Sequence, residues 1–225
     1  MFVTKSMTRD VITLSPDDSI LKARDLMQVH RIRHLPVVSE DYLLVGMVTD
    51  RDLRSAAPSS LFKGECTAEE QAALATFRVS EMMTSNLVTL SFSDTLQDAL
   101  LLIQKRKFGA LPVVDEEGRL AGILSVRDLL RAFVNVLGIG EPGTLLCIVV
   151  PDEFGQMKRI VDTIYEARVS TGSIVVARHW EEGKRVVFPY VFSINTAALK
   201  KRFKEKGYTL LDPLQWSIDE RQKSE

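Results

Sequence analysis

The chain has 225 residues, of which 45% are hydrophobic and 26% charged, and its net charge at pH 7 is −1. This composition is ordinary for a globular protein, and the balanced charge gives no reason to expect nucleic acid or an anionic membrane as a partner. The longest apolar runs are far shorter than the roughly 20 residues of a membrane-spanning helix, and residues 1–14 lack the apolar core of a secretory signal.

The first predicted element is a strand at residues 10–14, which is rich in β-branched residues. Residues 15–19 (SPDDS) offer an N-cap for a helix in which Ile20, Ala23 and Met27 recur at helical spacing. Residues 35–38 (LPVV) and 43–48 (LLVGMV) then predict a hairpin, and a short helix follows. The predicted order is β-α-β-β-α.

The same order returns 76 residues later. Residues 3–53 and 79–129 align without a gap and are identical at 20 of 51 positions. The octapeptides GMVTDRDL (46–53) and GILSVRDL (122–129) belong to this repeat. A gapless match of this length predicts one structural unit, duplicated and packed about a pseudo-twofold axis, and residues 67–78 predict a helix that links the copies.

The pattern changes after residue 143. A strand at 144–150, a helix with an apolar stripe from Met157 to Tyr165, two strands joined by the turn EEGK, a helix capped by Asn195 and a last strand at 208–212 predict the order β-α-β-β-α-β. This is the ferredoxin-like plan. The preceding GIGEPG (138–143) matches a dinucleotide fingerprint, but it follows a predicted helix instead of a strand, so we interpret it as a linker.

The Met-Thr opening, the Leu-Pro-Val-Val strand and the segment Gly-apolar-apolar-Thr/Ser-x-Arg-Asp, each present twice, resemble the CBS domain, which occurs in tandem pairs called Bateman modules. The C-terminal segment resembles an ACT domain, with Asp152 and Gly155 in an Asp-x-x-Gly turn. The whole order resembles acetoin-utilisation AcuB-type proteins.

The resemblance implies an α/β (α+β) fold with two paired CBS units and a ferredoxin-like domain. The expected boundaries are CBS units at 1–60 and 79–135, a linking helix at 61–78, a glycine-rich linker at 136–143, an ACT-like domain at 144–215 and a tail at 216–225.

The ends of the two octapeptides carry the candidate chemistry. Thr49-x-x-Asp52 and Ser125-x-x-Asp128 fit helix capping boxes, which need no ligand. Capping does not explain Arg51 and Arg127, because a cation in the first turn opposes the helix dipole. An anion held by the helix start, the hydroxyl and the guanidinium would offset that cost, and the aspartate could accept ribose hydroxyls.

A flat base needs apolar walls, which strand residues of each repeat could form: Ile12 and Pro36 in the first, Val88 and Pro112 in the second. Each repeat would then bind phosphate, ribose and base within one unit. The two copies differ, since Asp50 and the pair Arg33-His34 in the first copy correspond to Val126 and Gly109-Ala110 in the second. Gly109-Ala110 leaves room for a base, so we expect the second copy to hold an adenine nucleotide.

In the CBS family the matching positions commonly bind adenosine nucleotides between paired units. The resemblance therefore implies AMP, ADP or ATP as ligand, on the candidate residues Thr49, Arg51, Asp52, Ile12, His34, Pro36, Ser125, Arg127, Asp128, Val88, Ala110 and Pro112. It also implies a homodimer, and an amino-acid effector is a possible ligand of the loop with Asp152 and Gly155.

Other signals are weaker. His30 and His34 have the spacing of metal ligands on a helix, but no third ligand is evident, so we expect no metal. Cys66 and Cys147 fit neither a disulfide framework nor a zinc site and indicate a reduced, cytoplasmic protein. The basic stretch 200–208 is typical of a solvated helix face.

No catalytic motif is found, so the leading hypothesis is a non-catalytic sensor that acts on an unknown target protein. The alternatives are a structural interaction module and an NAD-dependent enzyme.

Overall fold

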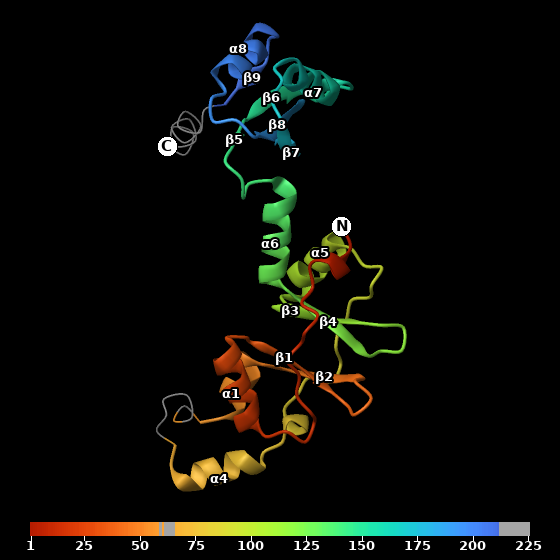
Figure 1. The fold of residues 1–225 in the computed structure, drawn as a ribbon, viewed down its shortest axis with the longest axis vertical. Helices are drawn as coiled ribbons and strands as arrows, with labels where there is room; N and C mark the ends of the chain where they lie inside the picture. Colours follow the sequence, from red (N-terminus) through yellow and green to blue (C-terminus); the bar gives the residue numbers. More distant parts are fainter. Residues whose placement is uncertain (59, 61–65, 212–225) are drawn as a thin grey trace. The chain divides into compact units, whose positions relative to one another are not determined.

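A computed structural model describes residues 1–58, 60 and 66–211 of the chain, except for the side chains of residues 179–180 (Figure 1). It divides into two compact units, residues 1–130 and 131–225. The first part of the expected linking segment, 61–65, and the expected tail, 216–225, lie outside the described residues. The predicted linking helix is confirmed as α4 (Ala68–Thr76), which begins after the capping box of Thr67 and Glu70.

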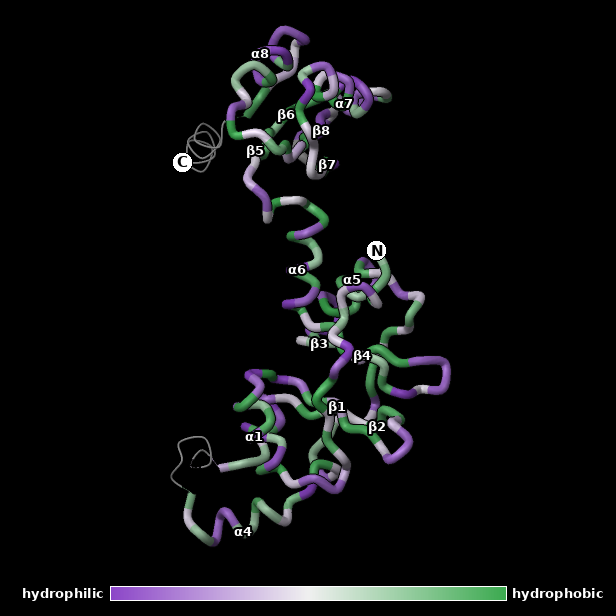
Figure 2. Tube along the Cα trace, viewed as in Figure 1, coloured by the Kyte–Doolittle hydropathy of each residue, from purple (hydrophilic) through white to green (hydrophobic). Residues whose placement is uncertain are grey.

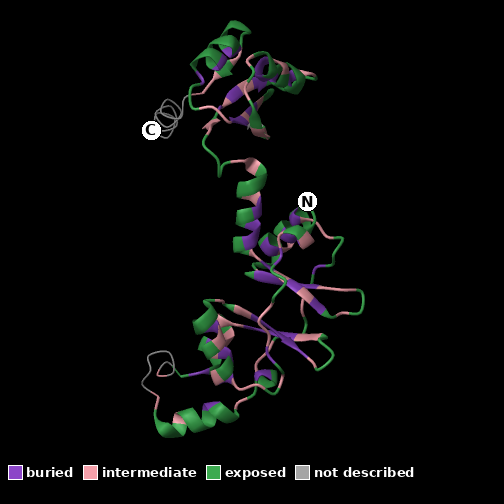
Figure 3. Ribbon diagram, in the orientation of Figure 1, coloured by how far each residue is buried: buried purple, intermediate pink, exposed green. Residues whose placement is uncertain are grey.

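Both repeats fold in the same way. The first contains η1 (Val3–Lys5), α1 (Ile20–His30), β1 (His34–Val38), β2 (Leu44–Thr49) and α2 (Asp50–Ala56); the second contains η2 (Val79–Glu81), α5 (Leu96–Arg106), β3 (Ala110–Val114), β4 (Leu120–Ser125) and α6 (Val126–Leu137). The predicted caps are confirmed, since Ser19 and Thr95 accept the backbone N–H groups of Lys22 and Asp98. Each strand pair is an antiparallel hairpin, and most of its residues are buried or half-buried (Figure 3).

The predicted strands at 10–14 and 86–90 are wrong. These segments contribute one bridge each to the neighbouring hairpin, Leu14 to Val37 and Leu90 to Val113. The Leu14 N–H donates to the Pro36 carbonyl at 2.9 Å, and the Leu14 carbonyl accepts the Val38 N–H at 2.9 Å. The pairing stops there because the next residues form the turn and cap that begin the helix.

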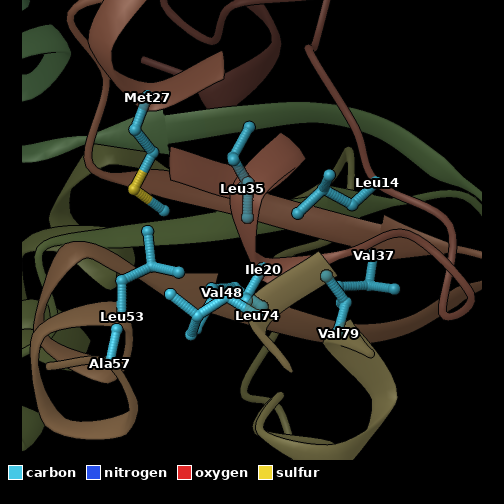
Figure 4. Close-up of a cluster of buried hydrophobic side chains, with 11 residues drawn as sticks. Leu14, Ile20, Met27, Leu35, Val37, Val48, Leu53, Ala57, Leu74 and Val79 are labelled. Carbon is cyan, nitrogen blue, oxygen red and sulfur yellow. The ribbon is translucent and has the colours of Figure 1, made fainter. Parts of the chain in front are cut away.

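The opening segments of the repeats are exchanged. Val79 lies in the hydrophobic core of the first repeat, beside Val37 (Figure 4), and its N–H donates to the Asp18 carbonyl at 2.8 Å. Reciprocally, the Val3 N–H donates to the Asp94 carbonyl of the second repeat at 3.0 Å. Each structural unit therefore takes its first turn from the other copy, which the boundaries expected from the sequence did not include.

This exchange explains why methionine and glycine are repeated. A Cβ on Gly122 would lie 2.7 Å from Met7 Sδ and 3.0 Å from the Thr8 carbonyl, and a Cβ on Gly46 would overlap Met83 Sδ. The Met-Thr segment of each copy thus crosses the glycine in the second hairpin strand of the other copy. Glycine is needed there because the approach leaves no room for a side chain.

The pseudo-twofold relation between the repeats is also visible at the hairpin turns. The Leu44 N–H donates to the Gly118 carbonyl at 3.1 Å, and the Leu120 N–H donates to the Tyr42 carbonyl at 3.0 Å. These two bonds are equivalent under exchange of the repeats. The predicted pairing of two CBS-like units into one compact body is therefore confirmed.

The C-terminal unit has the predicted β-α-β-β-α-β order. It contains β5 (Thr144–Leu145), β6 (Ile148–Pro151), α7 (Gln156–Glu166), β7 (Thr171–Glu181), β8 (Lys184–Val191), α8 (Ala197–Glu205) and β9 (Thr209–Leu210). β8 pairs with β7 and with β5 and β6, and β9 pairs with β6, all antiparallel, which is the ferredoxin-like arrangement.

Both helices of this unit pack on one face of the sheet. Ile160 and Ile164 of α7 and Leu199 and Phe203 of α8 share a buried cluster with alternate strand residues. Figure 2 shows that hydrophilic and hydrophobic residues are mixed along the traces of both helices. Two details differ from expectation. The strand at 144–150 is interrupted between Leu145 and Ile148, and Asn195 lies before the N-cap of α8, which is Thr196.

Candidate functional site

A cavity of about 510 Å³ lies between the two repeats, and both repeats contribute to its wall. The first repeat supplies the end of β2 and the start of α2 with Met47, Thr49, Asp50, Arg51 and Asp52, together with Arg33 and His34. The second supplies the segment after its Met-Thr opening and the segment that leads into β3, with Thr84, Asn86, Leu87, Val88, Lys107, Phe108, Gly109, Ala110, Leu111 and Pro112. We call this the inter-unit cavity, where a unit means one of the two repeats within residues 1–130.

An acid and a hydroxyl at the start of α2 border the inter-unit cavity. Thr49 and Asp52 form a capping box: the Asp52 N–H donates to Thr49 Oγ1 at 3.3 Å, while Asp52 Oδ2 accepts the Thr49 N–H at 2.8 Å and the Thr49 hydroxyl at 2.7 Å. Both bonds from Thr49 end on Oδ2, and among the described residues Asp52 Oδ1 accepts no hydrogen bond. The carboxylate therefore caps its helix and still has one oxygen available to a ligand.

The second repeat contributes an apolar part of the wall. It consists of Leu87 and Val88, which are half-buried, and of Ala110 and Pro112 at the start of β3, which are buried. Walls of this kind suit a flat apolar group better than a charged one. Arg51 of the first repeat and Lys107 of the second add positive charge to the wall.

His34 lies against Gly109. A Cβ on Gly109 would be 2.5 Å from His34 Nε2, so the imidazole occupies the space beside this glycine, while Gly109 and Ala110 both border the cavity. Burial, and then the charge of Arg33, lower the pKa of His34, while Asp52 and Asp50 oppose this shift. The imidazole is thus neutral near pH 7 and can both donate and accept a hydrogen bond in the cavity.

The residues expected to bind phosphate, ribose and base within one repeat do not lie together in the wall of the inter-unit cavity. The structure brings Thr49, Arg51, Asp52 and His34 of the first repeat together with Val88, Ala110 and Pro112 of the second. The physical reason is the exchange of opening segments: Thr84 pairs with Met47 across the repeats, and the residues after Thr84 therefore face the helix start of the other copy.

The remaining predicted residues lie elsewhere. Ser125 and Asp128 form the same capping box, with Ser125 N and Oγ donating to Asp128 Oδ2 at 2.9 and 2.6 Å, and Asp128 is buried. The wall of the inter-unit cavity includes none of Ser125, Asp128, Ile12 and Pro36. Arg127 borders a different cavity, beside α1 and α2.

Sequence reasoning missed Lys107, Phe108, Thr84 and Asn86, which border the inter-unit cavity. A signal for them was present in the repeat. Lys107 and Asn86 correspond to Arg31 and Asp10 in the alignment, and the segments that contain them flank the predicted base-contacting residues. They would have been found by combining the helix start of one copy with the flanking segments of the other.

A CBS domain family model matches residues 3–59 and 79–135, just over half of the chain, so the fold and the sequence agree on the class of protein. The chain belongs to the CBS domain family, in which it carries a tandem pair.

Solved structures of CBS pairs match the N-terminal part. CBSX2 from Arabidopsis thaliana is similar with a TM-score of 0.52 and 28% identity, over 59% of this chain and 94% of that one. A structure of CBSX2 in complex with AMP matches with a TM-score of 0.50 and 30% identity, over 59% of this chain and 96% of that one. A putative acetoin utilization protein (AcuB) from Vibrio cholerae matches with a TM-score of 0.51 and 28% identity, over 62% and 96%.

Curated relatives match the same region. A CBS domain-containing protein of Dictyostelium discoideum is 34% identical over 137 residues, which is 61% of this chain and 94% of that protein. Inosine-5'-monophosphate dehydrogenase of Aquifex aeolicus is 34% identical over 121 residues, which is 53% of this chain. The chain spans 22% of the length of that enzyme, so the likeness concerns a part of it.

The structure also shows the surroundings of the GIGEPG segment, of the candidate metal ligands and of Cys147. GIGEPG follows α6 and precedes β5, the reverse of the order that a dinucleotide site needs. Among the described residues, no group of three or more His, Cys, Asp and Glu side chains could hold a metal ion, and none of the helices described is long and apolar enough to cross a membrane. Burial raises the pKa of the Cys147 thiol, which makes it less reactive.

The loop predicted to bind an amino-acid effector begins α7. Gly155 is the N-cap residue, with a φ of 89° that favours glycine, and Asp152 forms an ion pair with Arg185 of β8. This ion pair and the backbone bond from Asp152 N–H to the Gly183 carbonyl tie the loop to the sheet. Both contacts hold the loop in position, and neither of them requires a ligand.

Proposed function

We propose that the protein is a non-catalytic regulatory protein that binds an adenosine nucleotide in the inter-unit cavity. The observation that carries this proposal is the combination, in one cavity of about 510 Å³, of a capped helix start and an apolar wall. Cavities of roughly 300–1,000 Å³ suit small molecules and cofactors. AMP is present in one of the similar CBSX2 structures, which supports this ligand class.

Each part of the nucleotide has a suitable partner. Asp52 Oδ1 would accept ribose hydroxyls, as acidic residues do in dinucleotide folds. Val88, Ala110 and Pro112 would pack against the base. The hydroxyl of Thr49 and the cations Arg51 and Lys107 would bind phosphate.

Regulation would follow from the composition of the wall. Because both repeats contribute to it, a ligand that binds one relative arrangement of the repeats better than another shifts the population toward that arrangement. A homodimer partner, the ACT-like C-terminal domain or a target protein would respond to this shift. The cytoplasm as location and the absence of catalysis are parts of the same proposal.

Titration calorimetry with AMP tests the proposal, with the variants Asp52→Asn and Asp98→Asn. Asp98 forms an equivalent capping box with Thr95 but is exposed, outside the inter-unit cavity, and so controls for the loss of a cap. We expect micromolar binding that Asp52→Asn weakens by about tenfold or more, as for a hydrogen bond to a charged group, and that Asp98→Asn leaves unchanged. A wild-type protein that binds none of AMP, ADP and ATP would favour a purely structural module.

A further inference from the structure

A second cavity, of about 400 Å³, collects arginines beside α1 and α2. Its charged wall consists of Arg24 of α1, Arg31 at the end of α1, Arg33 before β1, Arg54 of α2, Arg127 of α6 and one carboxylate, that of Asp50. We call it the arginine cavity. It borders the inter-unit cavity, because Arg33 and Asp50 belong to both walls.

The positive charge of the arginine cavity is only partly balanced. Arg54 Nε donates to Asp50 Oδ2 at 2.9 Å, and Arg24 Nε donates to Asp25 Oδ1 at 2.8 Å. Arg31, Arg33 and Arg127 have no carboxylate within ion-pair distance among the described residues. The chain as a whole has a net charge of −1, so this concentration of positive charge is local.

The repeat shows that the fold does not require a cation at three of these five positions, whereas the positions of Arg31 and Arg127 hold a cation in both copies, as Lys107 and Arg51 in the other one. In the second copy the positions of Arg24, Arg33 and Arg54 hold Leu100, Gly109 and Leu130. Leu100 and Leu130 are exposed, at 42% and 61%, so the second copy folds with neutral side chains on the equivalent surface. Three cations that the other copy lacks thus join two that both copies keep, and a concentration of like charges that repulsion disfavours indicates a ligand of opposite charge.

We propose that the arginine cavity binds a phosphate-rich anion. Guanidinium groups stay charged at every physiological pH and bind phosphate oxygens in pairs, and the apolar floor formed by Met27, Ile32 and Leu53 strengthens the attraction by excluding water. The phosphates have two possible sources, a free polyphosphate or the phosphate tail of a nucleotide whose base lies in the inter-unit cavity. The second source rests on the proposed function, and the first does not.

The test is a calorimetric titration of the full chain with sodium tripolyphosphate at fixed low ionic strength. The variants are Arg31→Gln and Arg127→Gln, with Arg106→Gln, an exposed arginine of α5 outside the cavity, as matched control. We expect each cavity variant to weaken binding by about tenfold, as for the loss of a charge-assisted hydrogen bond, with the control unchanged. Binding that is absent in the wild type, or that all three variants weaken equally, would overturn the proposal. Thermal melts that match wild type establish that the variants fold.

A second series distinguishes the two sources. If tripolyphosphate binds equally well to protein saturated with AMP, and ATP binds no more tightly than AMP, the cavity takes a free anion. If ATP binds more tightly than AMP and Arg31→Gln removes that advantage, the cavity takes the nucleotide's tail. Tripolyphosphate binding without AMP binding would refute the proposed function alone, whereas AMP binding without any effect of Arg31→Gln on tripolyphosphate or ATP would refute the arginine cavity alone.

Discussion

The two helix starts of the CBS pair have the same cap but different surroundings. Thr49 and Asp52 open onto the inter-unit cavity, against a wall that includes Gly109 and Ala110 of the second repeat. Ser125 and Asp128 do not border that cavity, and the first-repeat counterparts of Gly109 and Ala110 are the larger Arg33 and His34, which also belong to its wall. Duplication therefore gives two copies of the capping box, of which the one formed by Thr49 and Asp52 borders the inter-unit cavity.

The largest difference is expected between the variants Asp52→Asn and Asp128→Asn. We expect Asp52→Asn to weaken AMP binding by about 10- to 100-fold, the effect of losing a hydrogen bond to a charged group. Asp128→Asn should change the affinity less than about threefold, because Asp128 is outside the inter-unit cavity. Calorimetry with both variants measures the contrast, and a larger loss with Asp128→Asn would assign the ligand to the other helix start.

The crossing glycines offer a contrast in stability. Gly122→Val should lower the free energy of unfolding by about 2 kcal/mol and Gly46→Val by about 1 kcal/mol, within the range for overpacking. The difference arises because a Cβ at Gly122 meets the Thr8 carbonyl at 3.0 Å, which is backbone, whereas at Gly46 it meets the flexible side chain of Met83. Urea denaturation measures both values. As control, Gly140→Ala should have little effect, since its nearest neighbour would be at an ordinary 3.6 Å.

The contact of His34 with Gly109 can be tested by a double-mutant cycle. Gly109→Ala should destabilise the wild type, because the new Cβ would lie 2.5 Å from His34 Nε2, and it should be nearly neutral in a His34→Ala background. We expect a coupling energy of about 0.5–1.5 kcal/mol from denaturation curves, as for residues in contact. Equal costs in the two backgrounds would show that the imidazole does not occupy this position.

The smallest predicted effect is on the pH dependence of stability. Burial and Arg33 lower the pKa of His34 below its ordinary value of 6.5, so the unfolded chain takes up a proton at a pH at which the native imidazole is still neutral. The free energy of unfolding should therefore fall as the pH falls through about 6.5, until the lowered native pKa is passed. His34→Gln should flatten this slope in melts between about pH 7 and 5, and His30→Gln, at an exposed position of α1, should leave it unchanged.

Local signals in the sequence predicted much of this fold. The caps Ser19 and Thr95, the hairpins around Pro36 and Pro112 and the apolar stripe of α7 depend on neighbouring residues, so periodicity and capping chemistry were sufficient to find them. The strands predicted at 10–14 and 86–90 failed because β propensity does not say whether a partner strand is available.

The composition of the inter-unit cavity could not be predicted in the same way. Thr49 and Asp52 were found from their spacing, but their pairing with Val88 and Ala110 depends on which copy each opening segment packs against. That choice is a long-range property of the fold, and the repeat alone is compatible with either. The repeated methionine and glycine reflect the contact of Met7 with Gly122, but the sequence does not show that the two residues in contact belong to different copies.

The exchange of Val3 and Val79 has a consequence for the origin of the molecule. In a single ancestral copy, the opening turn would have had no second copy to pack against, and the core would have lacked this turn, unless an identical chain supplied both. We therefore expect the ancestor to have been an intertwined dimer with two equal binding sites. Fusion of two copies would allow their sequences to diverge, as they do at Gly109 and its counterpart Arg33. Residues 79–135 expressed alone should sediment as a pair of chains, and a folded monomer would contradict this history.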